Sequence, residues 1–428
     1  MADLKIDLLD PKDTLVFAHE DNDFRIPALL YVKEWKTFLA FAEKRTSTRD
    51  EHATSLVLRT ATRQPSGSLQ WSESWMDLTK ATKDGYRAMN PCPVFESSTG
   101  KLFLFFICVE GEVREFQLKA GQTKLCYITC AASPLRDESW TELTDLSDSA
   151  VGKYLEEYQT FAAGPGHGVQ LQSGRLLIPL YVKEFKDSNT WLFEVFPLWY
   201  FWTMKSYSLA LYSDDQGRTW QVGEKMPVES GEFQMAEVTD REGKGQLYCN
   251  ARNTKAVRLS KTSLRVEALS ADGGASFSML TELALQERPM GCQGSVLSFP
   301  ARELPAGGRA SSERGAGGGA SSQRGAGEGE REAGGEASSQ TALLFSHPTA
   351  GQGWDRLELG VHLRRSLQDH DPWGEPHIIH PGCSGYSDLA RCEEDGRFAC
   401  LMECAEGGHH SPSLGNRRKI TFQEFQLK

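Results

Sequence analysis

The sequence "SDDQGRTW", residues 213–220, is typical of a tight turn that closes a β-hairpin. Asp215 can accept hydrogen bonds from the amides of the turn, Gly217 can adopt a positive φ, and Trp220 can pack between strands. A weaker copy of the pattern, "SADGGASF", follows at residues 270–277. Two hairpin turns about 57 residues apart indicate repeated four-stranded sheets, which predicts a β-propeller and leaves a β-sandwich as the less favoured alternative.

Most of the remaining chain also consists of short strand-like segments. Apolar or alternating runs such as "KLFLFFICV" (101–109) and "GRLLIPLYV" (174–182) are bounded by Gly, Pro, Asn, Asp or Ser. Helical periodicity is nearly absent, and "SAVGKYLEEYQTF" (149–161) predicts one short helix. The chain is therefore predicted to be all-β. Its last run, "KITFQEFQL" (419–427), suits a closed array in which the final strand pairs with early ones.

The segment from residue 301 to residue 340 differs in composition from the rest of the chain. It consists mainly of Gly, Ala, Ser, Glu and Arg and contains the near-repeat "ASSERGAG" and "ASSQRGAG". Such a segment has too little apolar surface to offset the entropy lost on ordering, which predicts a flexible insertion. Strand-like runs resume at "TALLFSHP" (341–348). Residues 1–428 are therefore expected to form a single domain that this insertion interrupts.

Charge and cysteine usage exclude several functions. The formal net charge of −11 disfavours binding to nucleic acid or to an anionic lipid surface, because both need concentrated Lys and Arg. The N-terminal residues 1–13 lack the basic and apolar regions of a secretory signal, so we expect synthesis in the cytosol. The ten cysteines stand mostly in apolar runs and are expected to be reduced. A metal site at Cys392, Cys400 and Cys404 is disfavoured because no CxxC pair accompanies them.

One aromatic run bears on membrane contact. A bilayer-spanning helix needs about 18 to 20 apolar residues, and no run reaches that length. The nearest candidate, "WLFEVFPLWYFW" (191–202), is interrupted by Glu194 and Pro197. It fits a buried loop or edge strand, and it also fits an exposed aromatic loop at a membrane interface.

Several motifs resemble those of one enzyme family. The turn at 213–220 resembles the Asp-box of sialidases, and "FRIP" (24–27) resembles their arginine motif. Similar pieces include "FAAGPGHGVQLQSGRL" (161–176), "GYSDLA" (385–390) and "LMEC" (401–404). Nearly the whole chain resembles the cytosolic and membrane-associated sialidases of vertebrates, most of all their plasma-membrane, ganglioside-preferring branch. The resemblance implies a six-bladed β-propeller with its active site in the central cavity.

The resemblance also explains an arginine that stands directly before an apolar strand. Sialic acid carries a carboxylate on its anomeric carbon, and arginine is the side chain best suited to bind this group. The family match assigns Arg25, Arg252 and Arg356 to a carboxylate-binding triad, and it places Arg45 near the carboxylate or the 4-hydroxyl. Glu403 matches the carboxylate that orients Arg25 from behind.

Three further residues match the catalytic groups of the family. Tyr386 matches the nucleophile, Glu237 the carboxylate that takes its proton, and Asp50 the acid/base that serves the leaving oxygen and then water. A neutral phenol suits this substrate because an anionic attacker would be repelled by the carboxylate on the reacting carbon. The residues that match contacts to the N-acetyl and glycerol groups are Met89, Asn90, Glu115, Tyr181 and Gln293. Lys183 departs from the family, in which a second tyrosine often stands there.

The leading interpretation is an exo-α-sialidase that removes terminal sialic acid from gangliosides, oligosaccharides and glycoproteins with retention. No metal and no organic cofactor is expected. A catalytically silent propeller that binds sialic acid as a lectin or scaffold is the alternative, and the joint presence of Tyr386, Glu237 and Asp50 favours catalysis. The resemblance implies a peripheral location on the plasma membrane or another cellular membrane, with the cytoplasm as the alternative.

Overall fold

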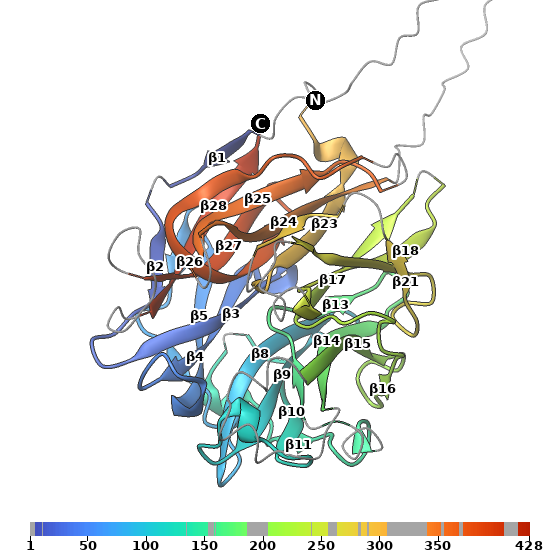
Figure 1. Cartoon of the computed structure of the whole chain (residues 1–428). Coiled ribbons are helices and arrows are strands. Elements are labelled where there is room, and N and C mark those ends of the chain that lie inside the picture. Colours follow the sequence, from blue (N-terminus) through green and yellow to red (C-terminus); the bar gives the residue numbers. More distant parts are fainter. Residues whose placement is uncertain are drawn as a thin grey trace, which may run out of the picture.

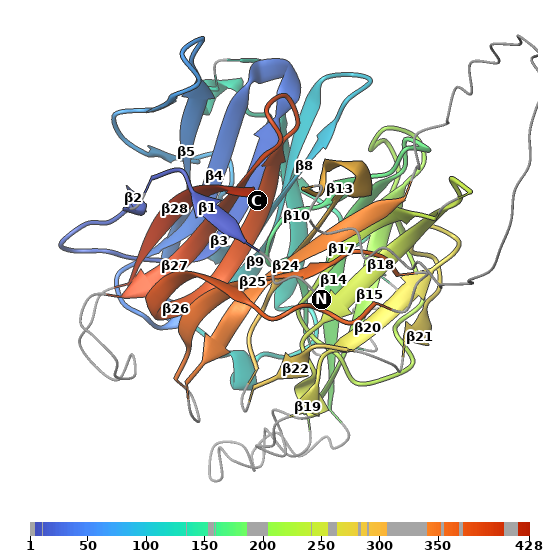
Figure 2. The ribbon, with the colours of Figure 1, turned by 90° about the horizontal axis from the view of Figure 1, so that it is seen from above.

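The computed structural model is built almost wholly from β-strands, whose sheets follow one another around a ring (Figures 1 and 2). It describes residues 5–10, 12–133, 135–152, 158, 160–185, 204–240, 242–255, 263–280, 284–288, 291–305, 340–351, 355–367, 371–405 and 418–428. The centre of the helix predicted over 149–161, the aromatic run at 191–202 and most of the 301–340 insertion lie outside the described residues.

The described strands form six groups, which we number as blades 1 to 6. Blade 1 contains β3 (Asp23–Val32), β4 (Thr37–Arg45), β5 (Ala53–Arg63), β6 (Leu69–Trp71) and β7 (Met76–Asp77). Blade 2 contains β8 (Tyr86–Glu96), β9 (Lys101–Glu110), β10 (Thr123–Cys130) and β11 (Thr144–Asp145). Blade 3 contains β12 (Thr160–Ala163), β13 (Val169–Gln170), β14 (Leu176–Phe185), β15 (Met204–Ser213) and β16 (Gln221–Val222).

The second half of the chain forms the other three blades. Blade 4 contains β17 (Phe233–Thr239), β18 (Gly245–Ala251), β20 (Val266–Ser270) and β21 (Ser278–Leu280), beside the small pair β19 (Ser263–Leu264) and β22 (Gln286–Glu287). Blade 5 contains β23 (Ser295–Pro300), β24 (Thr341–Ala350), β25 (Leu357–Arg364) and the start of β26 (His377–Cys392). Blade 6 contains the rest of β26, β27 (Arg397–Ala405), β28 (Arg418–Leu427), β1 (Ile6–Leu8) and β2 (Thr14–Phe17).

Helical structure among the described residues is limited to single turns. The 3₁₀ turns are η1 (Lys33–Trp35), η2 (Asp50–His52), η3 (Glu115–Gln117), η4 (Asp137–Ser139) and η5 (Ala301–Glu303).

Strand β26 belongs to two blades, which joins blades 5 and 6 into one continuous sheet. Its residues 377–383 pair with β25, and its residues 384–392 pair with β27. The pairing register shifts between Ser384 and Ser387, which marks the bend where the strand passes from one blade to the next. Tyr386 lies in this bend.

The core of the protein lies between the blades. Six clusters of buried apolar side chains each join neighbouring blades around the ring, including the contact of blade 6 with blade 1. This arrangement follows from strands that are apolar on both faces, such as β9, in which residues 102–109 are buried without a break. The predicted six-bladed propeller is therefore confirmed.

The two predicted hairpin turns share one hydrogen-bond pattern. Asp215 accepts hydrogen bonds from the Thr219 amide (2.8 Å) and the Thr219 hydroxyl (2.7 Å), and Gly217 adopts a φ of +79°. Trp220 is buried against Phe105 of blade 2, with ring centroids 4.8 Å apart. In the second turn, Asp272 accepts the matching bonds from the Ser276 amide (2.9 Å) and hydroxyl (2.6 Å).

The ring is closed by the two ends of the chain. Strands β1 and β2 both pair antiparallel with β28, so blade 6 combines the first and last strands (Figures 1 and 2). The predicted pairing of the final strand with early ones is confirmed. Closing the sheet array in this way removes two exposed edges.

A buried carboxylate ties four blades together at the centre of the ring. Asp388 accepts hydrogen bonds from the Leu29 amide of blade 1 (2.7 Å) and the Ser295 hydroxyl of blade 5 (2.7 Å). It also bonds to Nδ1 of His167, which lies in the β12–β13 connection of blade 3, at 2.8 Å. Burial lowers the pKa of His167, but the Asp388 carboxylate outweighs this effect and the pKa is raised. The central strands are thereby fixed relative to one another.

Candidate active site

A cavity of about 490 Å³ opens at one end of the ring. Every blade contributes to its wall, and the wall carries most of the residues that the sequence predicted. The predicted residues on the cavity are Arg25, Arg45, Asp50, Met89, Asn90, Glu115, Tyr181, Arg252, Arg356, Tyr386 and Glu403. Two predicted residues, Glu237 and Gln293, do not line it.

Tyr386 forms the floor of the cavity in the bend of β26, and 7% of its surface is exposed. Its hydroxyl donates a hydrogen bond to Oε1 of Glu232. The guanidinium carbons of Arg25 and Arg356 each lie 5.5 Å from the centre of its ring. Burial, followed by the negative charge of Glu232, raises the pKa of Tyr386, so the phenol is neutral until a base removes its proton.

The partner of Tyr386 is Glu232, so the prediction that Glu237 fills this position is wrong. Glu237 lies further along β17, where it is half-buried and accepts a hydrogen bond from the Gln172 amide at 2.8 Å. Glu232 immediately precedes β17, and its Oε2 accepts a hydrogen bond from Nη1 of Arg252 at 3.0 Å. The β17–β18 pairing explains the error: Phe233 pairs with Ala251, which brings Glu232 opposite Arg252. Once Arg252 had been assigned, the pairing of the two neighbouring strands could have pointed to Glu232.

Three arginines converge on the cavity from different blades. Arg25 comes from β3, Arg252 follows β18, and Arg356 precedes β25. Arg252 is held by Glu232, and Nη2 of Arg356 donates to the Gly291 carbonyl at 3.1 Å. The pKa of Arg252 is raised because Glu232 outweighs the effect of burial, so this cation is retained in a site that excludes much of the water.

Glu403 supports the floor of the cavity from β27. Its Oε1 accepts hydrogen bonds from Nε of Arg25 (3.2 Å) and from the Ile26 amide (2.9 Å), and its Oε2 accepts from the Tyr386 amide (3.3 Å). Burial raises the pKa of Glu403, but Arg25 and then Arg418 outweigh this and lower it. One buried carboxylate therefore positions both an arginine and the strand that carries Tyr386.

Glu43 plays the same part in the neighbouring blade and was not predicted. Its Oε2 accepts a hydrogen bond from Nε of the buried Arg45 (2.8 Å), and its Oε1 accepts from the Asn90 amide (2.6 Å). Asn90 and Ile26 both adopt positive φ values, 57° and 55°, in bulges of β8 and β3 that face the cavity. Glu403 and Glu43 therefore each bind one backbone amide at or beside a residue with a positive φ and one arginine nearby.

Asp50 stands at the mouth of the cavity, in the turn η2 that follows β4. Its side chain is 49% exposed, and its Oδ1 accepts hydrogen bonds from Arg25 (3.3 Å) and Arg45. Partial burial would raise the pKa of Asp50, but Arg45 and then Arg25 lower it to about 2. Asp50 is therefore ionised at neutral pH, and the two arginines extend its ionised range further into acid.

The part of the cavity wall that blades 2 and 3 contribute is mixed in character. Met89 is apolar, and Asn90 donates through Nδ2 to the Ala163 carbonyl at 3.1 Å. Lys183 forms an ion pair with Glu115, and burial lowers the pKa of Lys183 to about 8. This side of the cavity therefore offers a cation whose charge weakens above pH 8.

Gln293 lies behind the cavity and supports the same strand as Tyr386. It is fully buried, its Nε2 donates to the Ser387 carbonyl (3.0 Å), and its Oε1 accepts from the Ser387 amide (3.1 Å). The predicted contact of Gln293 with the substrate is therefore not supported. Its bonds instead fix the backbone next to Tyr386.

The cysteines and the surface bear on the remaining predictions. All ten cysteines are buried, and none of them forms a disulfide. Cys404 lies near Asp13 and His380, not in a group with Cys392 and Cys400. In the part of the chain that the structure describes, no helix has the length and apolar character needed to cross a bilayer.

Comparisons with known proteins agree with this fold. Residues 36–299 match the model of the BNR repeat-like domain. The chain is 43% identical to human Sialidase-3 over 404 residues, covering 91% of this chain and 88% of that one. It is 37% identical to human Sialidase-4, covering 98% and 93%. A mutant of Trypanosoma rangeli sialidase displaying trans-sialidase activity shares the fold with a TM-score of 0.64 at 15% identity, and 60% of that longer chain is covered.

The two human relatives match 91% and 98% of this chain. The structural neighbour supports the fold alone. The protein is a member of the sialidase family, similar to the Sialidase-3 branch.

Proposed function

We propose that the protein is an exo-α-sialidase that hydrolyses terminal sialic acid with retention of configuration. The hydrogen bond from the Tyr386 hydroxyl to Glu232, beneath three arginines, is the observation that carries this proposal. The arginines supply the charge that a carboxylate-bearing sugar requires, and the phenol with its base supplies the nucleophile. No step of the proposed reaction requires a metal or an organic cofactor.

Binding begins with the carboxylate of the sugar. Arg25, Arg252 and Arg356 receive it, and their approach from separate blades fixes its orientation. Arg25 also contacts Asp50, so the incoming carboxylate competes with Asp50 for the same guanidinium. This competition weakens the interactions that keep the pKa of Asp50 low, and Asp50 can then take up a proton.

Cleavage follows in two displacement steps. In the first, Glu232 takes the proton of Tyr386, the phenol oxygen bonds to the anomeric carbon, and the bond to the leaving oxygen breaks. Asp50 gives its proton to that leaving oxygen. In the second, Asp50 takes a proton from water, the water oxygen bonds to the anomeric carbon, and Tyr386 leaves and regains its proton from Glu232. Two inversions at one carbon give net retention.

The substrates proposed are sialylated glycolipids such as gangliosides, with oligosaccharides and glycoproteins as further substrates. The similarity to Sialidase-3 supports this order, as does the peripheral membrane location that the family resemblance implies. The non-catalytic alternative is less favoured because a pure binding site needs neither Glu232 beside Tyr386 nor Asp50 at the mouth of the cavity.

The test is release of fluorophore from an aryl α-sialoside by the purified protein and by Tyr386→Phe. The variant removes one hydroxyl and keeps the ring, so it should fold and still bind a sialic acid analogue. We expect kcat to fall by at least about 10³-fold, the loss associated with removal of a nucleophile. Turnover by Tyr386→Phe at the wild-type rate would refute the assignment.

A further inference from the structure

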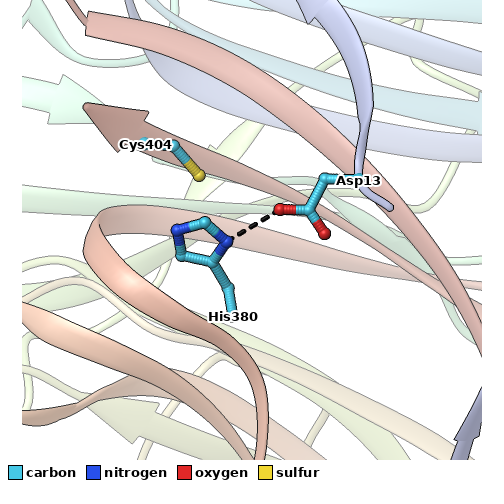
Figure 3. Close-up of side chains that lie close together, drawn as sticks. All are labelled: Asp13, His380 and Cys404. Atoms are coloured by element: carbon cyan, nitrogen blue, oxygen red, sulfur yellow. Dashed lines mark hydrogen bonds and ion pairs between the residues drawn. The ribbon is translucent and has the colours of Figure 1, made fainter. Parts of the chain in front are cut away.

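A second group of reactive side chains lies next to the cavity and takes no part in the mechanism above. Asp13 precedes β2, His380 lies in β26, and Cys404 lies in β27 directly after Glu403. Figure 3 shows the His380 ring between the Asp13 carboxylate and the Cys404 thiol. One ligand atom from each side chain lies within 4.8 Å of the other two. The group therefore combines a residue beside β2 and a residue of β27, both in blade 6, with a residue in the part of β26 that pairs with blade 5.

The carboxylate orients and charges the imidazole. Nδ1 of His380 bonds to Oδ2 of Asp13 at 2.7 Å, which leaves the rest of the ring available to Cys404 (Figure 3). Partial burial lowers the pKa of His380, but the hydrogen bonds with Asp13 and Cys404 outweigh it and raise the pKa to about 10. The ring therefore carries a proton and a positive charge at neutral pH.

The thiol stands between this cation and the cavity. Cys404 belongs to the cavity wall, although only 3% of its surface is exposed, and its Sγ also lies 3.2 Å from the Thr421 hydroxyl. A thiol beside a carboxylate-held imidazole is the arrangement found in Cys–His nucleophiles, in which the thiolate is the form that reacts with electrophiles. All ten cysteines are buried, so burial does not distinguish Cys404. Cys404 differs from the other cysteines because it lies beside an imidazole that a carboxylate holds in place.

The same geometry argues against a metal ion. Nδ1 of His380 is bonded to Asp13, so this nitrogen is not available to a metal ion unless the contact between Asp13 and His380 breaks. The arrangement of carboxylate, imidazole and thiol instead matches that of an activated cysteine nucleophile.

We propose that Cys404 is a reactive thiol, activated by His380 and Asp13, that opens the cavity to covalent modification by small electrophiles and peroxides. With iodoacetamide, the sulfur bonds to the methylene carbon, the carbon–iodine bond breaks, and iodide leaves while the imidazolium remains. With hydrogen peroxide, a sulfur–oxygen bond forms, the oxygen–oxygen bond breaks, and the leaving hydroxide takes the imidazolium proton to become water. The thiol is thereby oxidised to a sulfenic acid and the peroxide is reduced.

The full-length protein is treated with limiting iodoacetamide in its native state, and each cysteine peptide is quantified by mass spectrometry. We expect Cys404 to be labelled about tenfold faster than the other cysteines, and His380→Gln to reduce its rate about tenfold. Asp13→Asn keeps the shape of the carboxylate and should give a smaller reduction. Cys383→Ser, which alters another cysteine on the cavity wall, is the matched control and should leave labelling of Cys404 unchanged.

The proposal is overturned if other cysteines are labelled before Cys404, or if both His380→Gln and Asp13→Asn label at the wild-type rate. It is also overturned if the protein retains one equivalent of zinc after dialysis and loses it in Cys404→Ser. A second readout rests on the proposed function: sialidase activity should fall in step with labelling of Cys404, and Cys404→Ser should resist. Labelling is read by mass alone, so failure of the sialidase assignment would leave this test intact.

Discussion

At the scale of single residues, Tyr386 and Glu232 form the pair on which the chemistry depends. Their hydrogen bond places a base on the phenol, while the arginines around the ring favour the negative charge that develops on its oxygen. Glu237 lies on β17, which Glu232 immediately precedes, but it bonds to a loop amide of blade 3. The two glutamates therefore form a natural matched pair for mutation.

Glu232→Gln should lower kcat by about 10² to 10⁴-fold because the amide cannot accept the phenol proton. Glu237→Gln should keep kcat within about twofold, since it changes only a contact between β17 and the loop at Gln172. Both are measured by steady-state hydrolysis of an aryl sialoside. An equal loss in the two variants would contradict the assignment of Glu232 as the base.

Asp50 should matter most for substrates whose leaving group needs a proton. The Asp50→Ala variant should lose at least about 10²-fold in kcat/KM on a natural sialoside and much less on an aryl sialoside, because a phenolate leaves without assistance. The wild-type kcat/KM on the natural substrate should fall as pH rises, since Arg45 and Arg25 hold the pKa of Asp50 down to about 2. Equal losses on both substrates would exclude proton donation by Asp50.

Sequence alone could identify those site residues that belong to local motifs, but not those whose role depends on partners from other strands. Arg25, Asp50 and Tyr386 belong to local motifs that resemble the family, and they do lie on the cavity. Glu232 needed the pairing register of β17 with β18, which fixes its distance from Arg252. Glu43 could not be found because its function depends on the Asn90 amide, which belongs to another blade.

At the scale of elements, the hairpin turn at residues 213–220 couples local geometry to packing between blades. Gly217 has a φ of +79°, and a Cβ added there would lie 2.3 Å from the ring of Phe103 in blade 2. Gly174 has a similar φ of +89°, but nothing lies within 4 Å of its added Cβ. The two glycines separate backbone strain from steric conflict.

Gly174→Ala should lower the free energy of unfolding by about 1–2 kcal/mol, the cost of the left-handed backbone for a residue with a Cβ. Gly217→Ala should lower it by about 2–5 kcal/mol, because displacement of Phe103 is added to that cost. Urea denaturation of both variants measures the difference. Equal destabilisation would show that the turn does not depend on close packing against blade 2.

The turns themselves could be predicted because Asp, Gly and Trp act on their own neighbours in sequence. The path of β26 could not be predicted in this way, because a strand shared by two blades looks like any other strand in sequence. The same holds for the bulges that contain Ile26 and Asn90. Both depend on glutamates that lie on other strands.

At the scale of the whole molecule, four of the six blades are joined at the buried Asp388 carboxylate. Its partners come from blades 1, 3 and 5, so one side chain joins segments that are far apart in the sequence. Ring closure by β28 could be predicted from the terminal strand. This central connection could not, because "YSDLA" also fits an ordinary turn.

Replacing Asp388 by Asn should lower the free energy of unfolding by about 3–5 kcal/mol, the usual effect of breaking a buried ion pair. Ser295→Ala removes the hydroxyl that donates to the same carboxylate and accepts from the Leu389 amide, and should cost about 1.5–3 kcal/mol. Urea denaturation at constant pH measures both. Similar losses of unfolding free energy in the two variants would mean that the negative charge of Asp388 adds nothing to stability beyond its hydrogen bonds.

The ion pair between His167 and Asp388 also makes the stability of the protein depend on pH. The pKa of His167 is raised in the folded state, so its contribution is fully present below the unfolded pKa of about 6.5 and is lost as pH rises through the folded value. The pKa of His380 is also raised in the folded state, so its contribution to stability is likewise lost as pH rises. His167→Gln should therefore show a smaller loss of unfolding free energy above pH 6.5 than the wild type. An unchanged slope would exclude His167 as a source.

The pairing of β1 and β2 with β28 also affects how the protein is made. During synthesis, the strands that pair with the start of the chain leave the ribosome last, so the ring stays open while five blades are already available to fold. The apolar face of blade 1 that packs against blade 6 is exposed to solvent during this interval. A chaperone that recognises exposed apolar chain would therefore bind a nearly complete propeller in which the contact between blades 1 and 6 has not yet formed.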